Sequence, residues 1–256
     1  MTPLQYILAA LAAFAAGAVN ALAGGGTLIT FPTLTALGLP AVTANVTSTV
    51  SLFPGYFGAT WAQRGDLKGQ GKRLKYLLPA AAAGGLLGGI FLLLSGEKLF
   101  KQLVPFLILF ATLLLALSEP LRKRLARNTT KKTGKGKRLF LIAVPAIIIA
   151  AIYGGYFGAG LSVIVLAFLA LLFEDSLTRL NALKQAIAFA TNSAAAVFFL
   201  FSGRVNWGIA GVMAVSALLG GMAGGKLAGK VNPTTLRWIV ISIGLVITVI
   251  FFFQTF

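Results

Sequence analysis

The sequence contains no cysteine and no histidine, and only five of its 256 residues are acidic. Without thiols or imidazoles, disulfides, thiolate chemistry and the usual zinc and haem sites are excluded. The five carboxylates fall in connectors or at the ends of apolar stretches, so general acid–base catalysis has no histidine or buried carboxylate to use. These absences argue against an enzyme and predict no cofactor.

Charged residues are also missing from long parts of the chain. Residues 1–63 contain none, and neither do residues 139–173. The chain is 58% hydrophobic with a mean hydropathy of +0.91, whereas a soluble domain is about 45–50% apolar. No Lys or Arg precedes the first apolar run, so residues 4–23 are predicted to be a retained span rather than a cleaved signal peptide. We therefore expect an all-α polytopic membrane protein.

Positive charge, in contrast, is abundant, with a net charge of +17 at pH 7. Basic clusters such as residues 131–138 could neutralise the phosphates of a nucleic acid. They lie in short connectors between apolar stretches, however, where an excess of Lys and Arg holds a loop on the cytoplasmic side. The charge is therefore attributed to membrane topology, and no nucleic-acid partner is expected.

The apolar segments differ in length. A helix needs about 20 apolar residues to cross the hydrocarbon core, and eight segments reach that length. Two shorter segments, 27–38 and 161–173, each follow a glycine cluster and would reach only about 20 Å as helices. These two are predicted to be half-helices or steeply tilted. The full spans are expected at 4–23, 41–62, 76–95, 100–118, 139–157, 181–201, 207–226 and 235–253.

The sequence repeats itself at a fixed distance. The pattern GGLLGG at 84–89 recurs as GGMAGG at 220–225, 136 positions later, and the same distance separates Asn45 from Asn181. A constant offset shared by several residue types indicates a duplication. The predicted domains are a first membrane repeat at 1–118, a basic cytoplasmic linker at 119–138 and a second membrane repeat at 139–256.

The number of segments in each repeat decides how the repeats are oriented. Five crossings per repeat invert the second half relative to the first, whereas four make the halves parallel. With five, 19 of the 22 Lys and Arg residues fall on the cytoplasmic side, and with four only 15 do. The positive-inside rule therefore favours two inverted repeats of about five segments each, with both termini outside. The linker is expected to anchor this topology and to offer a contact for anionic lipid.

Glycine clusters that lead into short helices at corresponding places in two inverted halves are typical of transporter sites near the membrane midplane. The N-terminus of such a half-helix offers free N–H groups and a partial positive charge, which suits an anion. A purely structural interpretation, with tight turns, capping hydroxyls and no ligand, stays open beside it. The residues of the two breaks that we expect to contact the solute are Gly24, Gly25, Gly26, Thr27, Gly158, Gly160 and Ser162.

Polar side chains within the apolar segments complete the predicted site. Burying them has a cost, so they should face protein or a cavity, although amides and hydroxyls also serve to hold helices together. Lys184 is the one basic residue placed inside a span rather than close to its end, and it either points inward as the partner of an anion or snorkels to the cytoplasmic surface. The predicted solute-binding set therefore adds Asn20, Asn45, Thr47, Ser48, Asn181, Lys184, Gln185 and Asn192.

Three motifs resemble the sulfite exporter TauE/SafE family of membrane transporters. GAVNALAGGGT at 17–27 runs on to Phe31-Pro32, and LGLP at 37–40 is followed by ANVTS at 44–48. GRVNW at 203–207 precedes the glycine pattern GGMAGG at 220–225. The resemblance covers nearly the whole chain. It implies a permease of the plasma membrane that exports sulfite, sulfonates or related organosulfur anions, while the residue roles above rest on the physical argument.

The sequence therefore predicts an exporter of small sulfur-containing anions that works by alternating access in a bacterial or archaeal plasma membrane. Two other functions stay open: a permease for a carboxylate, another metabolite or a cation, and a non-transporting membrane scaffold or insertion factor. The paired polar breaks argue against the scaffold.

Overall fold

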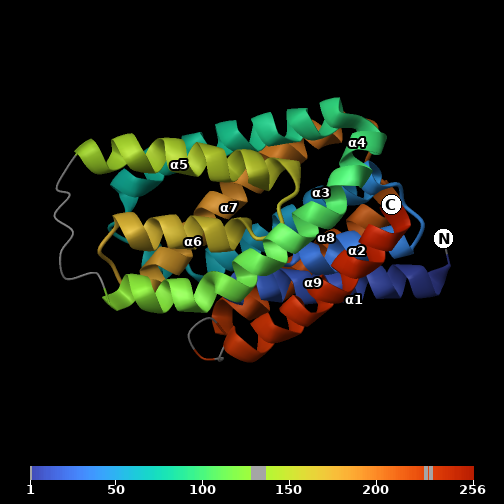
Figure 1. The fold of residues 1–256 in the computed structure, drawn as a ribbon. Coiled ribbons are helices and arrows are strands. Elements are labelled where there is room, and N and C mark those ends of the chain that lie inside the picture. Colours follow the sequence, from blue (N-terminus) through green and yellow to red (C-terminus); the bar gives the residue numbers. More distant parts are fainter. Residues whose placement is uncertain (1, 128–136, 228–229, 231–232) are drawn as a thin grey trace.

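The computed structural model describes residues 2–127, 137–227, 230 and 233–256, and every regular element within them is a helix (Figure 1). This confirms the all-helical expectation for the described residues. The elements are α1 (Pro3–Leu22), α2 (Thr27–Ala36), α3 (Ala41–Ala62), the 3₁₀ turn η1 (Arg64–Leu67), α4 (Gly71–Arg127), α5 (Lys137–Tyr156), α6 (Leu161–Leu172), α7 (Leu177–Leu200), α8 (Trp207–Leu227) and α9 (Pro233–Thr255).

The described helices are suited to a bilayer. Six contain a stretch long and apolar enough to cross a membrane, namely those in α1, α4, α5, α7, α8 and α9. Helix α3 has the length, but its threonines, serines and Asn45 make it less apolar. Large apolar side chains face outward, including Leu94, which is 77% exposed, and Leu141, which is 72% exposed. Apolar surface of this kind needs lipid to cover it, so the chain is a multi-pass membrane protein.

Helix α4 is two helices joined by a sharp bend at Gly96. This glycine has φ 66° and ψ 178°, a conformation that breaks the helix and turns the chain back on itself. The next residue, Glu97, accepts hydrogen bonds from the backbone N–H groups of Ala41 and Val42, the latter at 3.1 Å. Pro40 precedes α3 and offers no capping side chain, so the Glu97 carboxylate satisfies the first donors of that helix.

Glycines in α4 and α8 set how closely the helices approach each other. A Cβ added to Gly85 of α4 would lie 2.3 Å from the carbonyl oxygen of Thr191 in α7, and one added to Gly221 of α8 would lie 2.0 Å from that of Gly55 in α3. Neighbouring glycines of the two clusters meet the backbones of α5 and α1 in the same way. The glycine cluster of each predicted repeat therefore packs against helices of the other repeat.

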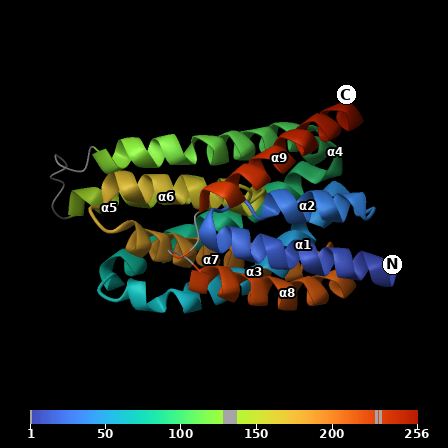
Figure 2. The same cartoon turned by 90° about the horizontal axis from the view of Figure 1, so that it is seen from below.

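The helices run along one long axis (Figure 1 and Figure 2). Both chain termini lie at one end of the molecule, and the end of α4 and the start of α5 lie at the opposite end in both views. Helix α1 therefore starts at the end of the molecule that carries the termini, and α5 starts at the other end. Residues 128–136 of the predicted linker lie outside the described residues, whereas 119–127 continue α4 and 137–138 begin α5.

Candidate functional site

Two interrupted helix pairs form the centre of the molecule. Helix α1 stops before Gly24 and Gly25, which have φ 85° and 93°, and α2 then begins at Thr27. Helix α5 stops before Gly158 and Gly160, with φ 83° and 79°, and α6 follows. Only glycine adopts such φ values without strain, so the two glycine clusters dictate the breaks. The short segments predicted at 27–38 and 161–173 correspond to α2 and α6.

The two breaks lie against each other. A Cβ added to Gly24 would lie 2.7 Å from the Cβ of Ser162, in the first turn of α6. Reciprocally, a Cβ added to Gly158 would lie 3.5 Å from the hydroxyl oxygen of Thr27, in the first turn of α2. Thr27 and Ser162 are both buried. The N-terminal ends of the two half-helices are thus brought together inside the protein.

Each break is closed by a side-chain amide from the other predicted repeat. The Nε2 group of Gln185, in α7, donates to the carbonyl oxygens of Asn20 and Ala21 at 3.1 and 2.8 Å. The Nδ2 group of Asn45, in α3, donates to the carbonyl oxygen of Tyr156 at 2.8 Å. These carbonyls belong to the last turns of α1 and α5, where a carbonyl oxygen no longer has a backbone N–H donor within its own helix. The cross-repeat amides therefore fix the position of both breaks.

These contacts also fix which way each amide points. A backbone carbonyl only accepts hydrogen bonds, so the NH₂ group must face it and the amide oxygen must point elsewhere. Asn45 Oδ1 and Gln185 Oε1 are buried and have no hydrogen-bond partner among the described residues, and neither does the Ser162 hydroxyl. Three polar groups at the breaks are thus left available, which is costly unless something else satisfies them.

The half-helix ends add donors to these groups. Gly26 and Gly160 precede α2 and α6, and no side chain caps either helix. The backbone N–H of Gly26 donates to the Asn20 side chain at 2.7 Å, whereas the N–H groups of Thr27 and Ser162 have no partner within the described part of the chain. The capping role that the sequence left open for the Thr27 and Ser162 hydroxyls is therefore absent.

Lys184 points into the protein rather than to the surface. It follows Asn181 on α7 by three residues and is 1% exposed, and no described residue forms a hydrogen bond or ion pair with it. A buried ammonium without a carboxylate is expensive, and an intramembrane cation generally marks a solute pathway. Of the two orientations considered from the sequence, the structure has the inward one.

Three of the other predicted site residues, Ser48, Thr47 and Asn181, join different elements, and Asn192 bonds within its own helix. Ser48 shares a hydrogen bond of 2.7 Å with Thr30 of α2. Thr47 accepts from the backbone N–H of Asn206 at 3.0 Å, linking α3 to the start of α8. Asn181 donates to the Gln63 side chain at 2.7 Å, and Asn192 donates to its own helix at 3.1 Å. Asn45 and Asn181, paired by the sequence repeat, therefore make different contacts.

Tyr153 is a site residue that the sequence reasoning missed. Its hydroxyl donates to the carbonyl oxygen of Ala159, between the two glycines of the second break, at 2.7 Å. The bond holds the turn between α5 and α6 in place. A polar ring one turn before the glycine cluster was the available signal.

The comparisons with known proteins agree with this architecture. Over residues 9–251 the chain matches the family model described as sulfite exporter TauE/SafE. It is 26% identical over 235 residues to a "Probable membrane transporter protein" of Haemophilus influenzae, covering 92% of this chain and 89% of that protein. It is 26% identical over 246 residues to "Probable membrane transporter protein ORF9" of a Sinorhizobium species, covering 93% and 89%.

A third relative is the "Probable membrane transporter protein YfcA" of Escherichia coli K12, 24% identical over 251 residues that cover 97% of this chain and 90% of YfcA. No solved structure matches the chain significantly. The family match spans both interrupted helix pairs and almost the full length of the sequence. This multi-pass membrane protein therefore belongs to the sulfite exporter TauE/SafE family of membrane transporters.

Proposed function

We propose that the protein exports a small sulfur-containing oxyanion, sulfite or an organosulfonate, by alternating access. The observation that carries the proposal is the buried meeting of the two glycine breaks, where polar groups from both repeats lack partners among the described residues. Such a place near the middle of a helical membrane protein is where transporters bind solutes. The inward-pointing Lys184 on the adjoining helix supplies positive charge for an anion.

The chemistry of the free groups narrows the class of solute. The Thr27 and Ser162 N–H groups are donors and suit oxyanion oxygens, while Asn45 Oδ1 and Gln185 Oε1 are acceptors. A site of this mixed kind fits an oxyanion that still carries a proton, such as hydrogensulfite, or one that keeps a bound water. A bare cation would find acceptors here but also an unpaired ammonium, which disfavours it.

Alternating access follows from the arrangement of two inverted repeats, 1–118 and 139–256. The opposite starting ends of α1 and α5 support the inversion. The exchanged glycine contacts support the duplication, because α8 packs on α1 and α3 as α4 packs on α5 and α7. The proposed arrangement counts the two arms of α4 separately and includes α3, which makes eight full spans beside the short helices α2 and α6, whereas six described helices meet the length and hydropathy of a span. Rocking of the repeats about the central breaks would expose the site to either side.

The proposed direction of transport and the proposed orientation in the membrane both rest on charge. The basic segment 119–138 is proposed to be cytoplasmic, where it anchors the topology and contacts anionic lipid, with both termini outside a bacterial or archaeal plasma membrane. Moving one negative charge out of a cell whose interior is negative by 100 mV releases about 2.3 kcal/mol. Export as a uniporter therefore needs no coupling ion.

Flux of sulfite into and out of proteoliposomes tests the proposal. Ser162→Ala is the sharpest variant, because its hydroxyl has no partner that the substitution would orphan. Removing one hydrogen bond to an anion should lower flux about tenfold or more. Ser193→Ala is the matched control, since that hydroxyl bonds only its own helix, at 2.7 Å. Lys184→Met should abolish flux, while Lys101→Met, on the exposed face of α4, should not.

The outcomes separate the competing functions. Flux of sulfite or sulfonates that Ser162→Ala reduces and Ser193→Ala leaves intact supports the exporter. Flux of carboxylates or other metabolites with no competition by sulfur anions indicates a different permease. Absence of flux for every solute, in protein that remains folded, indicates a scaffold.

A further inference from the structure

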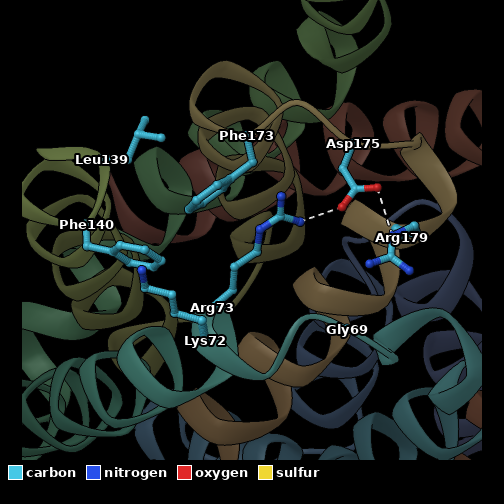
Figure 3. A pocket seen from close by; sticks show the side chains of 8 residues that line it. All are labelled: Gly69, Lys72, Arg73, Leu139, Phe140, Phe173, Asp175 and Arg179. Atoms are coloured by element: carbon cyan, nitrogen blue, oxygen red, sulfur yellow. Dashed lines mark hydrogen bonds and ion pairs between the residues drawn. The ribbon is translucent and has the colours of Figure 1, made fainter. Parts of the chain in front are cut away.

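A second charged site lies apart from the central breaks, at the end of the molecule where α4 ends and α5 begins. It is a cavity of about 280 Å³ between the start of α4, the start of α5 and the connection from α6 to α7 (Figure 3). Both predicted repeats contribute to its wall. The lining residues are Gly69, Lys72, Arg73, Leu139, Phe140, Phe173, Asp175 and Arg179.

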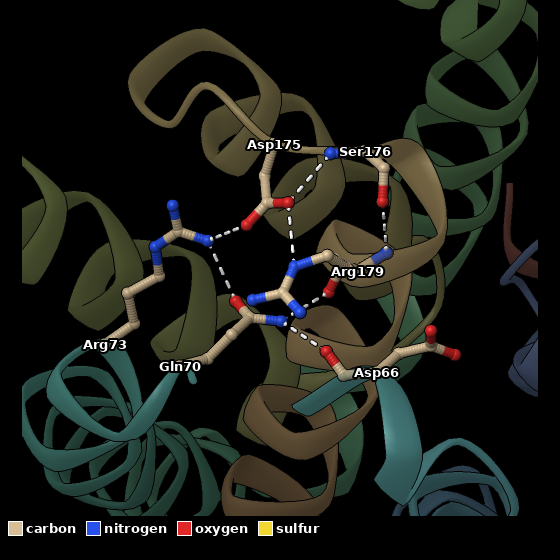
Figure 4. A network of polar contacts seen from close by, with 6 residues as sticks. All are labelled: Asp66, Gln70, Arg73, Asp175, Ser176 and Arg179. Carbon is tan, nitrogen blue, oxygen red and sulfur yellow. Dashed lines mark hydrogen bonds and ion pairs between the residues drawn. The ribbon is translucent and has the colours of Figure 1, made fainter. Parts of the chain in front are cut away.

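Positive charge exceeds negative charge in this cavity. Asp175 is the sole carboxylate among the lining residues, and three cations, Lys72, Arg73 and Arg179, line the same cavity. It accepts from Arg73 Nη1 at 2.6 Å, from Arg179 Nε at 2.8 Å and from the backbone N–H of Ser176 at 2.9 Å (Figure 4). One carboxylate shared by two arginines leaves the cavity with a surplus of two positive charges when Lys72 is included.

The cations also keep free donors. Each guanidinium has five N–H groups and directs only one nitrogen at Asp175. The same Arg73 nitrogen donates to Gln70 Oε1 at 2.9 Å. The Lys72 ammonium lies 5.8 Å from the centre of the Phe140 ring and has no carboxylate partner within the described structure. An oxyanion is the ligand that such a set of forked and single donors recognises.

The side of the cavity formed by the start of α4 is held by fixed contacts, as an anion site requires. Gln70 is 2% exposed, and its Nε2 donates to the backbone carbonyls of Asp66 and Arg179 at 2.9 and 3.0 Å (Figure 4). The Arg73 guanidinium lies 4.7 Å from the centre of the Phe173 ring, which holds it in place. These contacts join the start of α4 to the start of α7, so donors from both repeats are fixed in position before any ligand arrives.

The position of the cavity brings it to the membrane surface. Leu139 begins the apolar stretch of α5, and Phe173 directly follows the apolar helix α6. The charged groups therefore lie where the hydrocarbon layer gives way to head groups, and the Phe140 and Leu139 side chains supply an apolar wall beside them. We propose that this cavity binds a tetrahedral oxyanion group, either the phosphate of an anionic phospholipid or a dissolved oxyanion, and that the bound group joins the two repeats at this end.

Thermal unfolding of the full chain in nanodiscs tests the proposal without measuring transport, so it can fail independently of the exporter function. Discs of phosphatidylcholine are compared with discs that also contain phosphatidylglycerol. Discs of phosphatidylcholine alone are separately titrated with inorganic phosphate at constant ionic strength, which removes general screening. Lys72→Gln is the test variant, and Lys75→Gln, exposed one turn away and outside the cavity, is the matched control.

We expect the unfolding midpoint to rise with phosphatidylglycerol, with phosphate, or with both. The amount needed for half the effect should increase about tenfold in Lys72→Gln and by less than twofold in Lys75→Gln. A rise with phosphatidylglycerol alone identifies a lipid ligand, and a rise with phosphate alone identifies a dissolved one. No rise in either arm overturns the proposal, and so does an equal change in the two variants, because it would reflect surface charge only.

Discussion

The contact between the two breaks can be tested by a double-mutant cycle at Gly24 and Ser162. Gly24→Ala forces an L-residue into φ 85° and places its Cβ 2.7 Å from the Cβ of Ser162. The backbone strain costs about 1–2 kcal/mol, and forcing an extra carbon into a packed interior costs about 1–3 kcal/mol. We therefore expect Gly24→Ala to destabilise the protein by about 2–5 kcal/mol.

Gly38→Ala separates these two costs. Gly38 also has a left-handed conformation, with φ 93°, but an added Cβ there meets no atom within 4 Å. It should lose only the strain energy of about 1–2 kcal/mol. The excess cost at Gly24, about 1–3 kcal/mol, then measures the contact with the second break.

Ser162→Gly removes the atom that Gly24→Ala would strike. In the double variant the added methyl group has room, so the two substitutions together should cost about 1–3 kcal/mol less than the sum of the single ones. The assay is the unfolding midpoint in detergent, with flux recorded alongside, and 1 kcal/mol corresponds to about 2–4 °C in a protein of this size. Additive effects would refute the claim that the breaks touch.

Three further predictions follow from other parts of the molecule. In α8, Gly221→Ala should be strongly destabilising because its Cβ would meet the α3 backbone at 2.0 Å, while Gly211→Ala, with open space around it, should be neutral or slightly stabilising; unfolding midpoints compare them. Partial burial raises the pKa of Asp175, but the hydrogen bonds and charges of its arginine and backbone partners have the larger effect and hold this pKa below its usual value of 3.8. The stability that the Asp175 carboxylate contributes is therefore present above pH 3.8 and is lost only at lower pH. The stability difference between wild type and Asp175→Asn should thus be constant from about pH 5 to pH 8, and a change within that window would contradict the assignment. Since the chain has no cysteine, Lys68→Cys and Arg204→Cys, both exposed, should react with an impermeant thiol reagent from opposite sides of the membrane, and labelling from one side would contradict the inverted topology.

The sequence predicted the helices better than their contacts. The glycine clusters located both short helices to within two residues, because positive φ and a length too short to span are local properties. The offset of 136 paired Asn45 with Asn181, but the amide that closes the first break is Gln185, one turn further along α7. A repeat aligns backbones, whereas a hydrogen bond depends on side-chain length and on where the partner helix ends, which a single sequence does not encode.

The charged cavity was equally out of reach from the sequence. Lys72 and Arg73 counted only as loop charges that set topology, and the span was expected to start at residue 76 rather than at Gly71. Asp175 lies about a hundred residues away from Arg73, so their ion pair appears only in three dimensions. The sequence signal that existed was the rarity of acids, since each of so few carboxylates is a candidate for a specific contact.

Helix α7 connects the two sites that the structure reveals. Arg179 in its first turn faces the charged cavity, and Gln185, six residues later and about 9 Å along the same axis, closes the break between α1 and α2. A helix moves as a rigid body over so short a distance, so a displacement of α7 that released Gln185 from the α1 carbonyls would also pull the Arg179 backbone carbonyl away from Gln70 at the start of α4. An oxyanion bound in the cavity as proposed would therefore favour the arrangement in which Gln185 stays bonded to the α1 carbonyls.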